Sequence, residues 1–161
     1  MADAIVVKGV TARRLREEAG KLGLSLDEYL LELLTQNLDP RDRAKEYVNA
    51  LYDLLAEARE ELEKGNIRQA AEKTWGAAAL AVKAYALWKD GKHLVSHKEL
   101  WEYKSIIANE LGSWVLDAWA HANSMHACFY EGWCTREDVE AALTRVGKLV
   151  EEVKQKIKGI V

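Results

Sequence analysis

Histidine and cysteine are the side chains with the widest chemical use, and this chain has four of the first and two of the second. His121 and His126 are five residues apart, which places them about 140° apart around a helix, so they do not share one face as metal ligands. Cys128 and Cys134 lack the second pair that a zinc ribbon needs. No glycine-rich phosphate loop, nucleophile elbow or HExxH motif occurs. The sequence therefore predicts no metal site, no bound cofactor and no catalytic residue.

His126 has the most informative position, because it falls on the apolar face of its expected helix with Trp119, Ala122 and Phe129. A histidine on such a face is most often a hydrogen-bonded structural residue. The alternative is that it lines a cleft at the end of a helical bundle with Tyr130, where polar side chains can converge on a ligand. The candidate ligand-binding residues are His97, His121, His126, Tyr130, Glu131 and Trp133. Tryptophans that could add stacking surface, although such residues are more often core, are Trp75, Trp114, Trp119 and Trp133.

Residues 39–161 repeat a pattern of helix starts, apolar stripes and glycine stops that can position these side chains. Asp39-Pro40 is an N-cap followed by a proline suited to the first helical turn, and residues 96–99 form a capping box. A single proline in 161 residues also favours long helices. The fold class is therefore all-α: an up-and-down bundle of about five helices joined by short loops. The helix around residues 76–81 has small side chains on nearly every side, so we expect it to be the most central.

Residues 1–38 form a separate N-terminal unit in this interpretation. Ala4 to Val7 is a short β-type run, Thr11 can cap a first helix, and Ser25 begins a second helix through Leu34. A strand followed by two short helices is the order of a ribbon-helix-helix DNA-binding dimer. The apolar strand offers no polar side chain to read bases, so the alternative is a docking or dimerisation segment.

The composition bounds the class of protein. Apolar residues make up 49% and charged residues 30% of the chain, which excludes disorder, and the net charge of −3 excludes a broad basic surface for nucleic acid. No signal peptide and no 18-residue apolar run is visible, so we expect no membrane contact and a cytoplasmic location. The two cysteines fit a reducing compartment better than a disulfide scaffold.

Three stretches resemble the archaeal PaREP family, a branch of the HEPN superfamily of helical bundles: residues 70–85, 96–101 and 126–133. The resemblance covers about residues 24–157. It implies a four- or five-helix bundle, commonly a homodimer. HEPN proteins act as RNA-cleaving toxins and defence nucleases, or as nucleotide- and substrate-binding partners of nucleotidyltransferases. The nuclease members use an arginine followed by four to six residues and a histidine at the dimer cleft.

This sequence departs from the nuclease pattern, because none of its histidines has an arginine four to seven positions before it. His126 resembles the position of the family's arginine, and residues 129–131 occupy the place of the later histidine. Without a guanidinium to hold the scissile phosphate, RNA cleavage loses its electrostatic clamp.

We therefore expect a non-catalytic, homodimeric HEPN-like protein that binds a nucleotide, RNA or a protein partner at a cleft near His126. One alternative is a divergent ribonuclease that uses His121 or His126 with Glu131 as acid and base. A second is an antitoxin-like regulator that binds DNA through residues 1–38.

Overall fold

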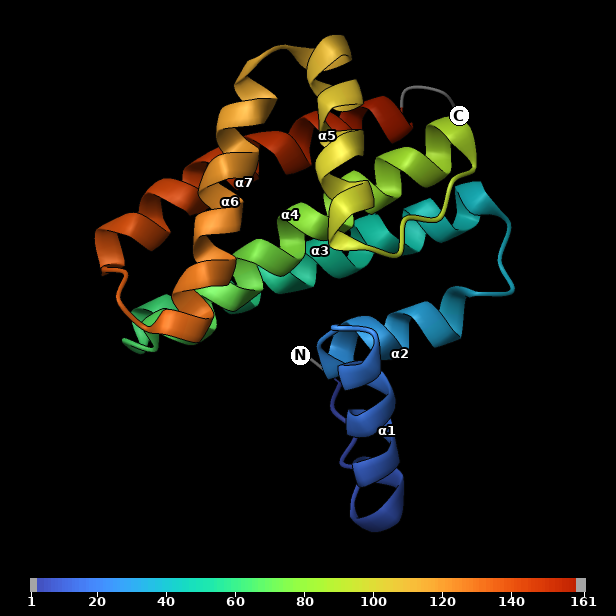
Figure 1. The fold of residues 1–161 in the computed structure, drawn as a ribbon, viewed down its shortest axis with the longest axis vertical. Coiled ribbons are helices and arrows are strands. Elements are labelled where there is room, and N and C mark those ends of the chain that lie inside the picture. Colours follow the sequence, from blue (N-terminus) through green and yellow to red (C-terminus); the bar gives the residue numbers. More distant parts are fainter. Residues whose placement is uncertain (1–2, 159–161) are drawn as a thin grey trace. The chain divides into compact units, whose positions relative to one another are not determined.

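The computed structural model describes residues 3–158, which contain seven helices and no strand (Figure 1). The helices are α1 (Gly9–Lys21), α2 (Leu26–Thr35), α3 (Pro40–Glu63), α4 (Ile67–Asp90), α5 (His97–Leu111), α6 (Trp114–Glu131) and α7 (Arg136–Lys158). They divide into two compact units, residues 1–37 and residues 38–161. The all-α prediction is confirmed. Within the described residues, no helix has the combination of length and apolar character that crossing a bilayer requires.

The expected count of about five helices fits the second unit, which contains α3 to α7, but it does not fit the described residues as a whole, which contain seven helices. The expected strand at Ala4 to Val7 is wrong, because in the described residues this segment lies outside any regular element. The physical reason is that a strand needs a neighbour for its backbone hydrogen bonds, and the described part of the chain supplies none.

Side-chain caps fix where α3 and α5 begin. The Asp39 carboxylate accepts hydrogen bonds from the backbone N–H groups of Arg41 (3.0 Å) and Asp42 (3.1 Å). Pro40 opens α3 at a position where its missing N–H costs nothing. At α5, the capping box between Ser96 and Glu99 is complete in both directions. These starts agree with the sequence prediction.

Helix α4 is the centre of the second unit. It packs against α3, α5, α6 and α7, and every residue from Thr74 to Leu87 is buried. The small side chains at 76–79 let neighbouring backbones approach it closely from several sides. This confirms the predicted central position. Helices α3 and α4 form an antiparallel hairpin, α5 and α6 lie across that hairpin, and α7 runs back along it (Figure 1).

Tyrosines join the core of this unit to carboxylates on neighbouring helices. The Tyr52 hydroxyl donates to Glu151 (2.8 Å), and the Tyr103 hydroxyl donates to Asp90 (2.6 Å). Burial of the hydroxyl, and to a smaller extent its hydrogen bond to the Asp90 carboxylate, raise the pKa of Tyr103 above its ordinary range. A tyrosine buries a large ring while its hydroxyl remains satisfied, which accounts for part of the tyrosine content.

The first unit is a short helical hairpin with few buried side chains. Gly23 has φ +67°, a conformation that glycine adopts without strain, and it turns the chain between α1 and α2. Ser25 caps α2 by accepting a hydrogen bond from the Glu28 N–H (3.2 Å). The buried side chains of its helices are Ala12, Ala19 and Thr35.

Candidate functional site

Three rings from three helices meet at one edge of the second unit. Trp75 on α4 stacks on His97 at the start of α5, with 5.1 Å between ring centroids and 24° between ring planes. His126 on α6 lies 5.0 Å from Trp75 and 5.5 Å from His97, measured between centroids. We call Trp75, His97 and His126, with the polar neighbours described next, the histidine–tryptophan cluster. The capping box positions His97 at the first residue of α5, while Trp75 is 5% exposed and fixed in the core.

The cluster contains a polar pair whose hydrogen bonds are not satisfied by the protein. His126 Nδ1 lies 3.7 Å from Glu72 Oε2, too far for a hydrogen bond, and the two side chains are 27% and 20% exposed. Both atoms are buried, and neither has a hydrogen-bond partner among the residues that the structure describes. Glu72 is three residues before Trp75, so both project from one face of α4. Because unpaired buried polar atoms are costly, this pair is suited to a ligand that can bridge it.

The remaining members connect the cluster to solvent. His97, which is exposed, has its Nε2 3.4 Å from Asn123 Oδ1, and Asn123 is one turn before His126 on α6. Tyr130 meets His126 edge-on at 5.1 Å between centroids and is 64% exposed. The cluster therefore has a partly buried polar floor at Glu72 and an exposed aromatic rim.

Residues 46–150 of the chain match the archaeal PaREP1/PaREP8 family. The chain belongs to this family. The match includes every residue of the histidine–tryptophan cluster. No curated protein and no solved structure matches the chain.

The structure brings together three of the residues that the sequence singled out in this PaREP1/PaREP8 family member, namely His97, His126 and Tyr130. His121 faces elsewhere, and its Nδ1 lies 2.9 Å from the carbonyl oxygen of Asp117 one turn earlier. Glu131 is exposed at the end of α6. Within residues 3–158, no ring contact joins Trp133, which is 71% exposed, to the cluster. Whether any of these residues binds a ligand stays a prediction.

Sequence reasoning missed Glu72 and Asn123 as members of the site. Each lies three residues before an aromatic residue of the cluster on the same helix, which is the signal that could have found them. Among the described residues, no group of three His, Cys, Asp or Glu side chains is placed so that it could hold an ion.

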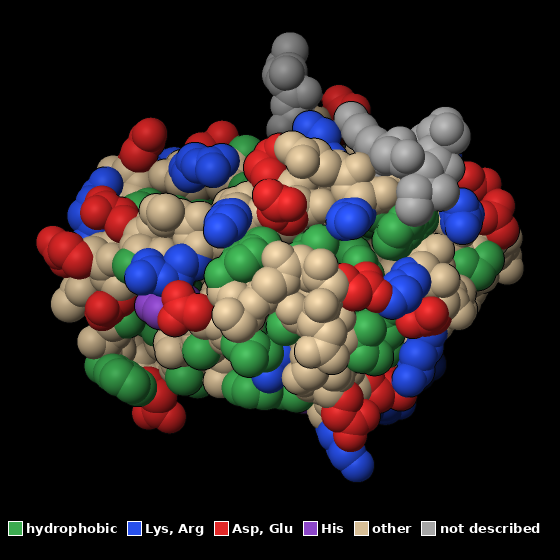
Figure 2. Space-filling model, turned by 90° about the horizontal axis from the view of Figure 1, so that it is seen from above, with side chains coloured by type: hydrophobic (Ala, Val, Ile, Leu, Met, Phe, Trp, Pro, Cys, Tyr) green, Lys and Arg blue, Asp and Glu red, His purple; other side chains and the backbone are tan. Residues whose placement is uncertain are grey.

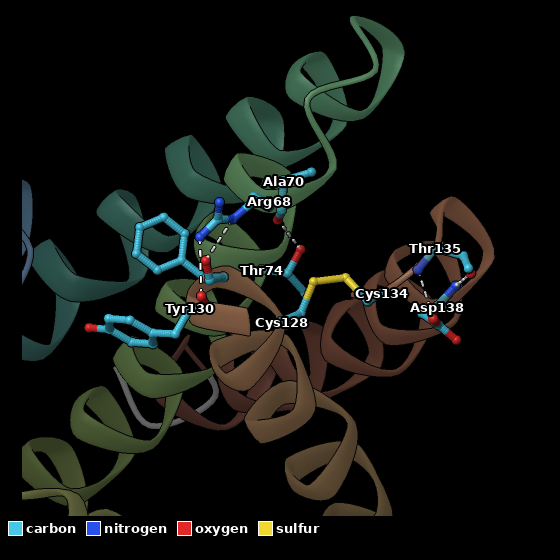
Figure 3. The surroundings of a disulfide bond; sticks show 9 residues. Arg68, Ala70, Thr74, Cys128, Tyr130, Cys134, Thr135 and Asp138 are labelled. Carbon is cyan, nitrogen blue, oxygen red and sulfur yellow. Dashed lines mark hydrogen bonds between the residues drawn. A yellow bond between two sulfur atoms is a disulfide. The ribbon is translucent and has the colours of Figure 1, made fainter. Parts of the chain in front are cut away.

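The end of α6 is held by a disulfide bond between Cys128 and Cys134, whose Cα atoms lie 5.5 Å apart (Figure 3). The expectation of reduced cysteines is therefore wrong. Gly132 ends α6 with φ +73° and turns the chain back, which brings the two residues within bonding distance. A single Cys pair separated by five residues gives no sequence signal that distinguishes a disulfide from two thiols.

Further contacts hold the segment on both sides of this disulfide (Figure 3). Arg68 on α4 donates hydrogen bonds to the carbonyl oxygens of Phe129 (2.9 Å) and Tyr130 (3.2 Å). These carbonyls lie in the last turn of α6, where the helix itself offers no N–H partner. Thr135 and Asp138 exchange two hydrogen bonds at the start of α7. Tyr130 is thus presented to solvent by an anchored backbone.

Proposed function

We propose that the chain is a non-catalytic, HEPN-like homodimeric protein that binds a nucleotide or a single-stranded RNA base at the histidine–tryptophan cluster. The observation that carries this proposal is the unpartnered pair of Glu72 Oε2 and His126 Nδ1 beside the exposed rim of His97 and Tyr130. The edge of a base can form the hydrogen bonds that Glu72 and His126 lack, and its faces can stack on the aromatic rings of His97 and Tyr130.

Charge favours recognition of a base over recognition of a phosphate. The carboxylate of Glu72 repels a phosphate placed beside His126. Arg68, one turn before Glu72, already donates to the end of α6. On the face drawn in Figure 2, basic and acidic side chains are interspersed with apolar ones, which does not favour a continuous track for a phosphate backbone.

The lack of a guanidinium for the scissile phosphate supports a binding role over RNA cleavage. The geometry also supports a second candidate, a divergent ribonuclease, because a carboxylate beside an imidazole can serve as acid and base. The pair would then be Glu72 and His126; the earlier expectation of Glu131 has less support, because Glu131 is exposed at the end of its helix.

Binding can be measured by fluorescence anisotropy with a short labelled single-stranded RNA, and by calorimetry with the four nucleoside monophosphates. We expect the wild type to bind, Tyr130→Ala to weaken binding about tenfold through lost stacking, and Glu72→Gln to weaken it through the altered base-edge contact. His121→Ala is the matched control, because it removes a histidine from the same helix outside the cluster. Absence of binding by the wild type, or equal loss with His121→Ala, would contradict the proposal.

The same RNA, incubated with the protein and run on a sequencing gel, separates the two candidates. We expect no cleavage by the wild type. Cleavage by the wild type that His126→Ala abolishes would establish the ribonuclease in place of the binding protein.

The DNA-binding alternative for residues 1–38 has less support, because the exposed side chains of Ile5, Val6 and Val7 have no group that can hydrogen-bond to base edges. A gel shift with duplex DNA at low salt tests it, and a shift that salt weakens would favour the regulator.

A further inference from the structure

The N-terminal unit has too little core to be stable by itself. Of its large apolar side chains, Ile5 is 90% exposed, Val6 76%, Leu22 60% and Leu34 80%. Units below about 40 residues usually need a disulfide, a metal or association with another chain. Both cysteines lie in the other unit, and the described residues contain no metal-binding group. Association is therefore the remaining source of stability for this unit.

The segment before α1 has the properties of a strand without a partner. Lys8 is extended, with φ −129° and ψ 165°. No backbone hydrogen bond joins Ile5, Val6 or Val7 to any other described residue. Three consecutive β-branched residues favour a strand, and an unpaired extended segment is a template for pairing with another one.

A second copy of the chain is the occupant that fits this segment best. Residues 3–158 contain no strand elsewhere, so the described chain offers no partner for the segment. An extended segment pairs antiparallel with an identical one around a two-fold axis, which makes the contact complementary to itself.

The two helices carry opposite net charges, which is compatible with contact between α1 and α2 of different copies as well as within one copy. In α1, three arginines and Lys21 exceed the two glutamates, whereas α2 has Asp27, Glu28 and Glu32 and no basic residue. A two-fold axis that places α1 of one copy beside α2 of the other creates two equivalent contacts, and in each of them the basic helix faces the acidic helix.

We propose that residues 3–37 are a dimerisation unit, in which Ile5–Val7 pair antiparallel with the same residues of a second copy. That copy also covers the exposed apolar side chains of α2, among them Leu33 and Leu34. The inference identifies the contact for the homodimer proposed above, and it is independent of what the histidine–tryptophan cluster binds.

Light scattering after size exclusion of the full chain tests this contact. We expect a dimer for the wild type, and monomers for Val6→Pro and Leu34→Glu at the same concentration. Leu116→Glu is the matched control, because Leu116 is a partly exposed leucine (42%) on α6 in the other unit, and this variant should stay dimeric. A monomeric wild type, which would mean that the unit docks within its own chain, or a fully dimeric Leu34→Glu, would overturn the proposal.

Cysteine cross-linking tests the antiparallel geometry. In an antiparallel pair around a two-fold axis, the residue at the axis lies opposite the same residue of the other copy. Of the variants Ile5→Cys, Val6→Cys and Val7→Cys, one should therefore cross-link to a clearly greater extent than the other two under mild oxidation. Val95→Cys is the control, since Val95 is 64% exposed in the other unit. Equal cross-linking of all four variants, or none at the three N-terminal positions, would refute the pairing.

The cluster variants distinguish failure of this inference from failure of the proposed function. Glu72→Gln should remain dimeric while losing RNA affinity. Leu34→Glu should become monomeric, and its cluster, which lies wholly within residues 72–130, should keep its fold as judged by circular dichroism. A dimer lost in Glu72→Gln would show that the cluster, and not the N-terminal unit, holds the two copies together.

Discussion

Opening the disulfide between Cys128 and Cys134 should lower stability by an amount that the loop length sets. The two residues are separated by six positions, so the bond closes a loop of about seven residues. The chain-entropy relation gives about 2.4 kcal/mol for such a loop at 25 °C. For a chain of this size, that free energy corresponds to a fall in Tm of roughly 5–10 °C.

The assay is thermal unfolding followed by circular dichroism, with the wild type measured with and without reductant and Cys134→Ser measured in the same two buffers. Cys134 is the better residue to replace, because Cys128 is 1% exposed and a hydroxyl there would be buried. We expect reductant and Cys134→Ser to lower Tm by similar amounts. Reductant should not change the Tm of Cys134→Ser, which has no disulfide to lose.

Two results would refute this reasoning. Equal shifts by reductant in the wild type and in Cys134→Ser would mean that the effect does not come from the bond. Titration of two free thiols in the denatured, unreduced wild type would mean that the bond is not formed.

Three further substitutions test other parts of the fold. Hydrogen bonds from the backbone N–H groups of Val95 and Ser96 hold the pKa of the Glu99 carboxyl below its ordinary value. The ionised carboxylate therefore stabilises the folded protein fully at pH values above the ordinary glutamate pKa of about 4.3. This stabilisation is lost as the pH falls through the lower pKa of the folded state. Urea unfolding should therefore show Glu99→Gln less stable than the wild type at pH 7 and equal to it in acid; a constant difference would contradict this. Ala78→Leu should lower the free energy of unfolding by about 1–3 kcal/mol through overpacking, since Ala78 is 0% exposed, and an unchanged urea midpoint would argue against a close-packed α4. Gly132→Ala should cost about 1–2 kcal/mol in the same assay because of the left-handed backbone at Gly132, whereas Gly147→Ala, at a helical glycine with open space around its Cβ position, should be neutral or stabilising.

The helices were predictable because local signals specify them. The structure confirms the Asp39 cap, the Ser96 capping box and the central position expected from the small residues of α4, and each of these signals lies within a few consecutive residues. Such features depend on residues that are close in the sequence, which a reader of the sequence can see directly.

The site was predictable only in part, because its members come from three helices. His126 and Tyr130 are four residues apart on one helix, and their association follows from that spacing. Glu72 and His97 lie on other helices, so their contacts with His126 depend on how α4, α5 and α6 pack and do not follow from their spacing in the sequence. The disulfide was missed for a related reason, since it depends on the turn at Gly132.

Because α4 is central and α5 is peripheral, the histidine–tryptophan cluster has one rigid side on α4 and one more mobile side on α5. Trp75 and Glu72 project from a helix enclosed by four others, whose amides should be among the last to exchange with deuterium. His97 stands on the first turn of a peripheral helix; besides its ring contacts with Trp75 and His126, its side chain has a long 3.4 Å contact to Asn123. A ligand would therefore meet one immobile wall and one that can adjust, so ligands of different width would be accommodated by movement of α5 and not of α4.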